Sequence, residues 1–242
     1  MKNIALLIAA ASLCAPACQK PPTEAEIHLA KGNELFAKSD FAGAGAALEQ
    51  SLKLQPQQDV KVWEKAAFSY MKAGNTDKAA ELLVKASENG PKEKKLEALR
   101  NVAGMYLQAQ QGDKAEQYFL EVMKLDPKDD QSLSWLAEIA SIRGGARDMK
   151  AQALTPALEV AMGRYDQVIA LTPKAPGPYV NKRIALIKYI NHLIQQRDAM
   201  KNKKEVQILQ AKIDQLKATL DETTRQLSEI SKAAKAAKAA AK

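Results

Sequence analysis

One arrangement of small and large apolar residues occurs three times between Ala25 and Pro127. Three alanines are separated by 35 and 36 residues, and three prolines are separated by the same two intervals: Ala44, Ala79 and Ala115; Pro56, Pro91 and Pro127. A chain with such a period folds as a row of similar units, each packed on its neighbours. The period therefore predicts a repeat protein.

Each copy has the spacing of two amphipathic helices. In the second copy, Trp63, Ala67 and Tyr70 recur at three- and four-residue intervals, Gly74 interrupts them, and the pattern resumes at Ala79. Small residues allow close approach of two helices, and the larger ones fill the remaining volume. A proline then ends the second helix, because it has no amide hydrogen and clashes with the preceding turn. The expected unit is a pair of antiparallel helices joined by a tight turn.

These copies resemble the tetratricopeptide repeat family, whose unit is 34 residues long. When the copies are counted from Ala25, Val60 and Leu96, the positions that this family keeps small, large or proline are filled in phase: Gly32, Ala67 and Ala103 at position 8; Leu35, Tyr70 and Tyr106 at 11; Ala44, Ala79 and Ala115 at 20; Pro56, Pro91 and Pro127 at 32. Ser51 and Val122 depart from it at position 27, and the third turn is expected two places late, at Gly112-Asp113. The resemblance implies an all-α solenoid of helical hairpins over residues 25–173.

A fourth repeat is interrupted. Its first helix is expected to end at Gly144-Gly145, and its second helix begins about twelve residues late, near Ala161. Residues 146–158 therefore read as an insertion. We interpret it as an extension of the second helix from near Met149, with contact to a partner as the alternative.

The C-terminal third predicts long helices. Residues 174–201 have an apolar stripe that would cap the end of the solenoid: Val180, Ile184, Ile187, Ile190 and Ile194. Residues 202–231 carry heptads, from Val206 to Ile230, typical of a coiled coil. This pattern predicts self-association through residues 206–230 or pairing with another helix. The alternative is a helix folded back onto the solenoid, with its turn at Asn202-Lys204.

Positive charge is concentrated in the same part of the chain. The formal net charge is +8, and from Lys174 onward 15 Lys and Arg stand against 6 Asp and Glu. Residues 232–242 are only alanine and lysine. Such a tail either binds an anionic surface of the cell envelope or is a solvated helix end.

The N-terminus is typical of an export signal. A positive start precedes the apolar run Ile4–Leu13, which is too short to cross a bilayer, since a spanning helix takes about 20 residues. The end of the run resembles a bacterial lipoprotein signal, with residues 1–17 as signal peptide, Cys18 as the lipid-bearing first mature residue and residues 18–24 as tether. Ala15 and Pro16 depart from the usual lipobox. Ordinary cleavage after Ala17, giving a soluble periplasmic protein, is the alternative.

The resemblance to lipoproteins also implies a location. Gln19, where an aspartate would favour the inner membrane, indicates the outer membrane, with the protein facing the periplasm. An exported protein is not expected to meet nucleic acid. The two cysteines, Cys14 and Cys18, both lie in the signal region, so a mature disulfide is not expected.

No constellation of catalytic residues is evident. His28 and His192 are the only histidines, and neither lies among cysteines or carboxylates at metal-ligand spacing. The sequence predicts a protein that is not an enzyme and that needs no cofactor or metal.

Family resemblance places a binding groove on the first helix of each repeat, at positions 2, 5, 9, 12 and 13. The residues expected to bind a partner are Leu29, Asn33, Phe36, Lys61, Glu64, Phe68, Met71, Lys72, Arg100, Leu107 and Gln108. Apolar members would be buried by the partner, and Lys61, Lys72 and Arg100 would pair with its carboxylates. The other interpretation of any one of them is ordinary surface.

Two hypotheses follow for the function. The first is a lipoprotein scaffold of the bacterial envelope whose groove captures protein partners of a pilus, outer-membrane biogenesis or gliding-motility assembly. The second is a coiled-coil oligomer whose basic tail binds an anionic envelope surface.

Overall fold

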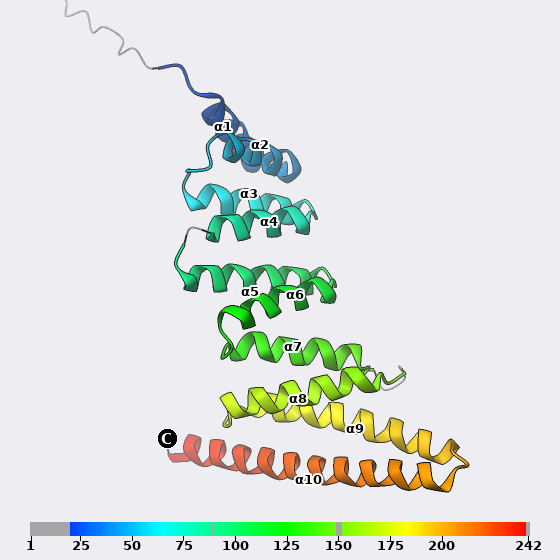
Figure 1. Ribbon diagram of the computed structural model, residues 1–242. Helices are drawn as coiled ribbons and strands as arrows, with labels where there is room; N and C mark the ends of the chain where they lie inside the picture. The colour runs from blue at the N-terminus through cyan, green and yellow to red at the C-terminus, as the bar shows by residue number, and fades with distance from the viewer. Residues whose placement is uncertain (1–19, 89, 149–151, 241–242) are drawn as a thin grey trace, which may run out of the picture. The chain divides into compact units, whose positions relative to one another are not determined.

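The computed structural model describes residues 20–88, 90–148 and 152–240 (Figure 1). All regular secondary structure within these ranges is helical. The helices, in chain order, are α1 (Glu24–Ala37), α2 (Phe41–Leu54), α3 (Val60–Lys72), α4 (Thr76–Ser87), α5 (Lys92–Gln108), α6 (Gly112–Leu125), α7 (Asp130–Arg143), α8 (Thr155–Leu171), α9 (Pro176–Ala199) and α10 (Lys203–Ala240). Residues 1–19, which include the predicted signal peptide and Cys18, lie outside the described residues.

Short polar side chains fix where several helices begin. Thr23 and Glu26 form a capping box at α1, in which the Thr23 hydroxyl accepts from the Glu26 amide at 3.3 Å and the Thr23 amide donates to the Glu26 carboxylate at 2.7 Å. Asp40, Asp59 and Asp129 cap α2, α3 and α7 in a similar way. These bonds satisfy amides that have no partner inside the helix.

The same turn ends the first helix of each of the four repeats. One residue adopts a positive φ, and the next amide donates to the carbonyl five residues earlier, as in a Schellman motif. The four positive-φ residues are Ser39, Gly74, Gln110 and Gly145. Their separations of 35, 36 and 35 residues show that the fourth repeat keeps its phase as far as Ala146.

The prediction of a late third turn is wrong. Gln110 has a φ of 58° and occupies the place that Gly74 holds one repeat earlier, whereas Gly112 is the first residue of α6. A glutamine can occupy a left-handed position at moderate energetic cost, so the absence of glycine there does not move the turn.

The first of two compact units ends at Asn75 and holds α1, α2 and α3. Ala44 is fully buried in it, and the Leu48 side chain packs against the α-carbon of Gly32. The buried Ser51 hydroxyl donates to the carbonyl of Ala25 at 2.6 Å, so position 27 of this repeat is filled by a residue that forms a hydrogen bond rather than by alanine.

The second unit begins at Thr76 and holds α4 to α10. Successive helices pack on one another, with Ala115 and Ala161 fully buried at equivalent places of the third and fourth repeats. Tyrosine hydroxyls donate to carboxylates of neighbouring helices from three places: Tyr106 to Asp77, Tyr165 to Glu138 and Tyr189 to Glu159. These bonds pair the polar end of a large buried ring with an acceptor.

The inserted segment of the fourth repeat is tied to the helices around it. Ala146 and Ala153 are buried, and the Lys188 ammonium donates to the carbonyl of Asp148 at 2.9 Å. The second helix, expected to extend back towards Met149, begins at Thr155; Met149 itself lies outside the described residues. Residues 146–148 and 152–154 are thus outside the helices, and buried alanines and a hydrogen bond connect them to the rest of the unit.

The two last helices form a hairpin, because α10 follows α9 after a break at Met200–Asn202 and packs on it (Figure 1). The heptad residue Ile213 is fully buried, and Leu209, Leu216 and Leu220 pack against the same core as Leu193 of α9. The stripe predicted for self-association is therefore occupied within the chain, as in the folded-back alternative.

The apolar residues expected to form the packing face of the capping helix, α9, are only partly buried. Val180 and Ile187 remain exposed, while Tyr179, Leu186 and Tyr189 are buried. The reason is that α9 is covered by α8 on one side and α10 on another, and these two contacts select a different face of the helix. None of the helices in the described ranges has the length and apolar composition needed to span a membrane.

Candidate functional site

The eleven residues expected to bind a partner are divided between the two compact units. Eight lie on α1 and α3 of the first unit, and Arg100, Leu107 and Gln108 lie on α5 of the second. We describe each group within its own unit.

Three phenylalanines from three helices meet in the first unit, and we name them the phenylalanine cluster: Phe36, Phe41 and Phe68. Their ring centroids are 5.7 Å (Phe36 and Phe41), 6.0 Å (Phe36 and Phe68) and 6.3 Å (Phe41 and Phe68) apart. Two of the pairs meet edge to face, an arrangement that aromatic rings prefer. The Phe68 side chain is 40% exposed, so the cluster presents an aromatic surface to solvent.

Sequence reasoning found Phe36 and Phe68 but missed Phe41. Phe41 is the first residue of α2, immediately after the turn at Ser39-Asp40, and the groove positions considered lie only on first helices. The signal for it was a large apolar residue directly after a tight turn, which is placed beside the end of the preceding helix.

Two lysines of the first unit lie over the rings of this cluster. The Lys65 nitrogen is 5.5 Å from the Phe36 centroid and 2.8 Å from the Asn33 amide oxygen. The Lys72 nitrogen is 5.3 Å from the Phe68 centroid. These are cation–π distances, so the cluster has positive charge at its edges. Asn33, Phe68 and Lys72 were predicted, and Lys65 was not.

A shallow hollow of about 160 Å³ lies between the three helices of this unit. It brings together the predicted residues Leu29, Asn33 and Lys61 with Lys65. Glu64 and Met71 are also exposed on α3. All eight predicted residues of this unit thus lie on α1 and α3. The hollow joins three of them, and the ring contacts of the cluster join Phe36, Phe68 and Lys72.

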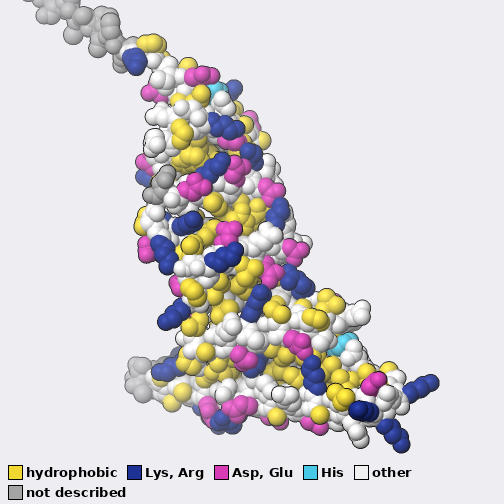
Figure 2. Space-filling view, in the orientation of Figure 1, with side chains coloured by type: hydrophobic (Ala, Val, Ile, Leu, Met, Phe, Trp, Pro, Cys, Tyr) yellow, Lys and Arg dark blue, Asp and Glu magenta, His cyan; other side chains and the backbone are white. Residues whose placement is uncertain are grey.

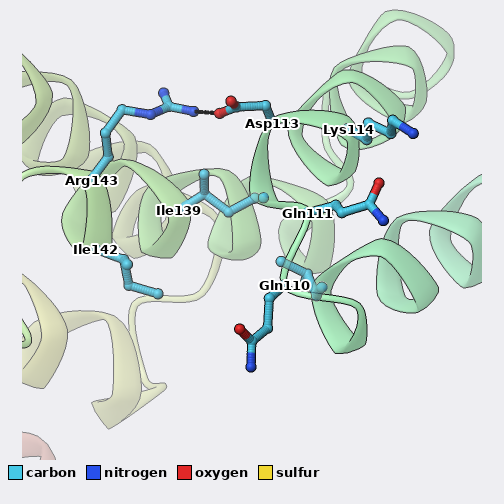
Figure 3. Close-up of a pocket in the computed structure, with 9 residues that line it drawn as sticks. Gln110, Gln111, Asp113, Lys114, Ile139, Ile142 and Arg143 are labelled. Carbon is cyan, nitrogen blue, oxygen red and sulfur yellow. Dashed lines mark hydrogen bonds and ion pairs between the residues drawn. The ribbon is translucent and has the colours of Figure 1, made fainter.

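A larger pocket, of about 720 Å³, lies in the second unit (Figure 3). Leu107, Ile139 and Ile142 supply its apolar surface, and the turn between α5 and α6 supplies Gln110 and Gln111. Figure 3 shows Arg143 reaching from α7 towards Asp113, with which it forms an ion pair at 2.8 Å. Leu107 was predicted as a binding residue. Gln110 and Gln111 were missed because the groove positions do not include turns, and the residues of α7 were missed because groove positions were assigned only in the first three repeats.

Arg100 has a partner inside the chain. Its guanidinium donates to Asp129, whose buried carboxylate also accepts from the Ser132 amide at 2.7 Å and so caps α7. A carboxylate from a binding partner would have to compete with this contact. Gln108, by contrast, is exposed on α5.

A charged network joins α6, α7 and α8 near the pocket. Arg143 donates to Glu116 at 2.7 Å, and Arg164 donates to Glu116 at 3.0 Å and to the Leu136 carbonyl at 2.8 Å. Burial by itself raises the pKa of the Glu116 carboxyl, but the hydrogen bonds from both arginines outweigh it and hold that pKa below its ordinary value. Glu116 is thus an ionised structural group.

The described residues contain no group of three or more His, Cys, Asp and Glu arranged to hold a metal ion. His28 and His192 are both half-buried and lie in α1 and α9. What the two surfaces offer is burial of apolar groups together with charge, which is the chemistry of protein binding. Figure 2 shows apolar and charged side chains interspersed on the face that it presents.

Helical hairpins that recur along the chain, with exposed side chains on their first helices, define the class of a helical repeat protein. The family model described as "Tetratricopeptide repeat" matches residues 35–103. Among solved structures, a TPR repeats protein from Bacteroides fragilis is similar, with a TM-score of 0.59, 15% identity and coverage of 87% of this chain and 92% of that chain. The chain therefore has an all-α fold of tetratricopeptide-repeat hairpins, followed by a long C-terminal helix with heptad spacing.

The crystal structure of the MamA protein is also similar, at 16% identity, with coverage of 86% of this chain and 92% of that chain. Its TM-score is 0.49. No curated protein sequence matches the chain.

Proposed function

We propose that the protein is a scaffold lipoprotein of the bacterial cell envelope, without enzymatic activity, which captures protein partners on the first helices of its repeats. The observation that carries this proposal is the exposed phenylalanine cluster with lysines at its edges. Tetratricopeptide-repeat proteins generally bind other proteins, and this surface has the composition of a binding centre.

The energetic argument concerns Phe68. Full burial of a phenylalanine side chain contributes about 1.5–3 kcal/mol relative to its exposure, and Phe68 is 40% exposed in the isolated chain. Aromatic side chains at the centre of an interface carry much of the binding energy of protein complexes. A partner that covers Phe68 therefore gains stability that the protein alone does not have.

The envelope location rests on the N-terminal sequence. A positive start, a short apolar run and Cys18 at the position of a lipid-bearing cysteine support export and anchoring in the outer membrane, on its periplasmic side. The assemblies that such a lipoprotein would serve are those of pili, outer-membrane biogenesis or gliding motility. Cleavage after Ala17 would give a soluble periplasmic form of the same scaffold.

The alternative function, a coiled-coil oligomer with a membrane-binding tail, has less support. Its apolar stripe packs on α9, with Ile213 fully buried, so oligomerisation would require the hairpin to open. Lys232, Lys235 and Lys238 are exposed near the end of α10 and remain compatible with an anionic surface.

The test is chemical crosslinking of the full-length protein in its own cells, followed by identification of partners by mass spectrometry. We expect to recover envelope proteins from the membrane fraction. The Cys18→Ala variant should no longer be found in the membrane fraction. Recovery of cytoplasmic proteins alone, or unchanged membrane attachment of Cys18→Ala, would contradict the proposal.

A matched pair of variants tests the surface. Phe68→Ala should reduce the recovery of the same partners, whereas Leu120→Ala, which removes a side chain of similar exposure (39%), should not. Equal recovery by both variants would exclude the cluster as the binding centre. Arg100→Ala is unsuitable for this test because it breaks the contact with Asp129.

A further inference from the structure

We infer that the phenylalanine cluster binds an acidic segment of the partner that carries an aromatic side chain between carboxylates, an inference that rests on the proposed function and specifies the partner's chemistry. Two properties of the first unit lead to it. One is the position of three lysines that form no ion pair within the described residues, and the other is the geometry of its rings.

The lysines on α3 have no carboxylate partner among the described residues, whereas two other lysines of the first unit do. Lys38 pairs with Glu34 at 2.5 Å and Lys53 pairs with Glu49 at 2.9 Å. Within the described ranges, Lys61, Lys65 and Lys72 form no ion pair. Their charges are therefore available to carboxylates from another molecule.

These charges and the aromatic centre lie along one face of α3. Lys61, Lys65, Phe68 and Lys72 follow one another at intervals of four, three and four residues, which places them in a row on a helix. Lys65 and Lys72 thus flank Phe68. At 1.5 Å per residue, they start from backbone positions about 10 Å apart along the helix axis.

That separation corresponds to about three residues of extended chain. A segment with one aromatic residue and carboxylates on both sides can therefore place its ring at Phe68 and a carboxylate near each lysine. A polar uncharged segment would leave the lysine charges uncompensated, and a basic segment would be repelled by them.

The rings of the cluster favour an aromatic occupant. The planes of Phe36 and Phe41 meet at 80°, and those of Phe41 and Phe68 at 81°. A fourth ring placed against the exposed part of Phe68 can extend this edge-to-face arrangement. Such ring pairs add stability beyond that of the apolar area they bury, which an aliphatic side chain would not provide.

The experiment uses the full-length protein and three fluorescein-labelled pentapeptides, measured by fluorescence anisotropy at low salt. The probe is Asp-Asp-Phe-Asp-Asp, and the comparators are Asn-Asn-Phe-Asn-Asn and Asp-Asp-Ala-Asp-Asp. We expect the probe to bind and each comparator to bind at least about tenfold more weakly. Equal binding of either comparator would overturn the inference, because it would remove the need for the charges or for the ring.

Protein variants locate the site. Phe68→Ala should weaken binding of the probe by about tenfold, and Lys65→Gln and Lys72→Gln by about fivefold each. Lys124→Gln, an exposed lysine of the second unit, is the control and should bind as the parent does. Glutamine keeps two of the four side-chain methylenes of lysine and removes its charge. Circular dichroism spectra that match the parent's would show that a loss of binding does not come from misfolding.

Failure of this inference differs from failure of the proposed function. If no pentapeptide binds while Phe68→Ala still abolishes partner recovery from cells, the inference is wrong and the proposed function stands. If the probe binds as expected while partner recovery is unaffected by Phe68→Ala, the stated chemistry holds for the surface and the scaffold role of the cluster is wrong.

Discussion

Ser39 and Gln110 are not glycines, yet they adopt a positive φ, as Gly74 and Gly145 do in the other repeats. In a residue with a β-carbon, a left-handed φ brings that carbon too close to the following carbonyl oxygen, which costs about 1 kcal/mol. The turn is nevertheless formed, because the hydrogen bonds that close it, such as Asp40 to Leu35 at 3.0 Å, are the same in each repeat.

Ser39→Gly should stabilise the protein by about 1 kcal/mol, because glycine removes that contact at the turn. The measurement is the urea midpoint of unfolding, followed by circular dichroism. Gly74→Ala is the matched control and should destabilise by a similar amount, because the φ of Gly74 is 80°. No neighbouring atom obstructs the new methyl group, so the backbone conformation is the only cause of the effect. A lower midpoint for Ser39→Gly would contradict the assignment of strain at this residue.

Gly32 is required for a different reason, the approach of a neighbouring helix. A β-carbon at this position would lie 2.6 Å from Cγ of the fully buried Leu48. Gly32→Ala should therefore lower the free energy of unfolding by about 1–3 kcal/mol. Gly104→Ala, in α5, meets no atom within 4 Å and should be neutral or stabilising. Thermal unfolding of the two variants decides, and equal midpoints would show that Leu48 moves aside without cost.

At the scale of elements, the network around Glu116 connects three helices through charge. The pKa of Glu116 in the folded protein is below its ordinary value of 4.5. Ionised Glu116 therefore contributes stability at pH values above its unfolded pKa, and this contribution is lost as the pH falls through the lower folded pKa.

Glu116→Gln should flatten the loss of thermal stability between pH 6 and about pH 3 relative to the parent. At neutral pH the variant should be less stable, because Arg143 and Arg164 lose their shared carboxylate. Differential scanning calorimetry at the two pH values measures both effects. An identical acid response in parent and variant would mean that other carboxylates control it.

The C-terminal hairpin offers a direct contrast between two isoleucines of one helix. Ile213→Asp places a charge in the core shared by α9 and α10 and should destabilise by several kcal/mol, while Ile208→Asp, at a side chain 64% exposed, should have little effect. Thermal unfolding and analytical ultracentrifugation measure stability and mass. Dissociation of an oligomer by Ile213→Asp, with unfolding unchanged, would instead support the coiled-coil alternative.

At the scale of the whole molecule, the sequence predicted the helical repeats, although it misplaced the third turn and the start of α8. Its alanines and prolines recur in phase because the helices of every repeat pack closely at the same positions. The complete burial of Ala44, Ala79 and Ala115 shows this. The hairpin of α9 and α10 was only one of two predicted possibilities. A heptad stripe specifies an apolar partner but does not determine whether that partner is another chain or the preceding helix.

The candidate site was predicted in part, for physical reasons. Positions on first helices follow from the repeat, so Phe36, Phe68 and Lys72 were found. Phe41 and Lys65 join them through contacts across a turn and between helices, which repeat positions alone do not reveal. The internal partner of Arg100 depends on the cap of a later helix, Asp129, and no periodicity indicates it.

The central claim is that the partner lies on the phenylalanine cluster. The measurement that tests it most directly is photocrosslinking in the producing cells, with a photoreactive amino acid placed at position 68 and, in a second strain, at position 120. We predict a defined envelope-protein adduct from position 68 and none from position 120. Adducts of equal yield from both positions, or from position 120 alone, would contradict the account.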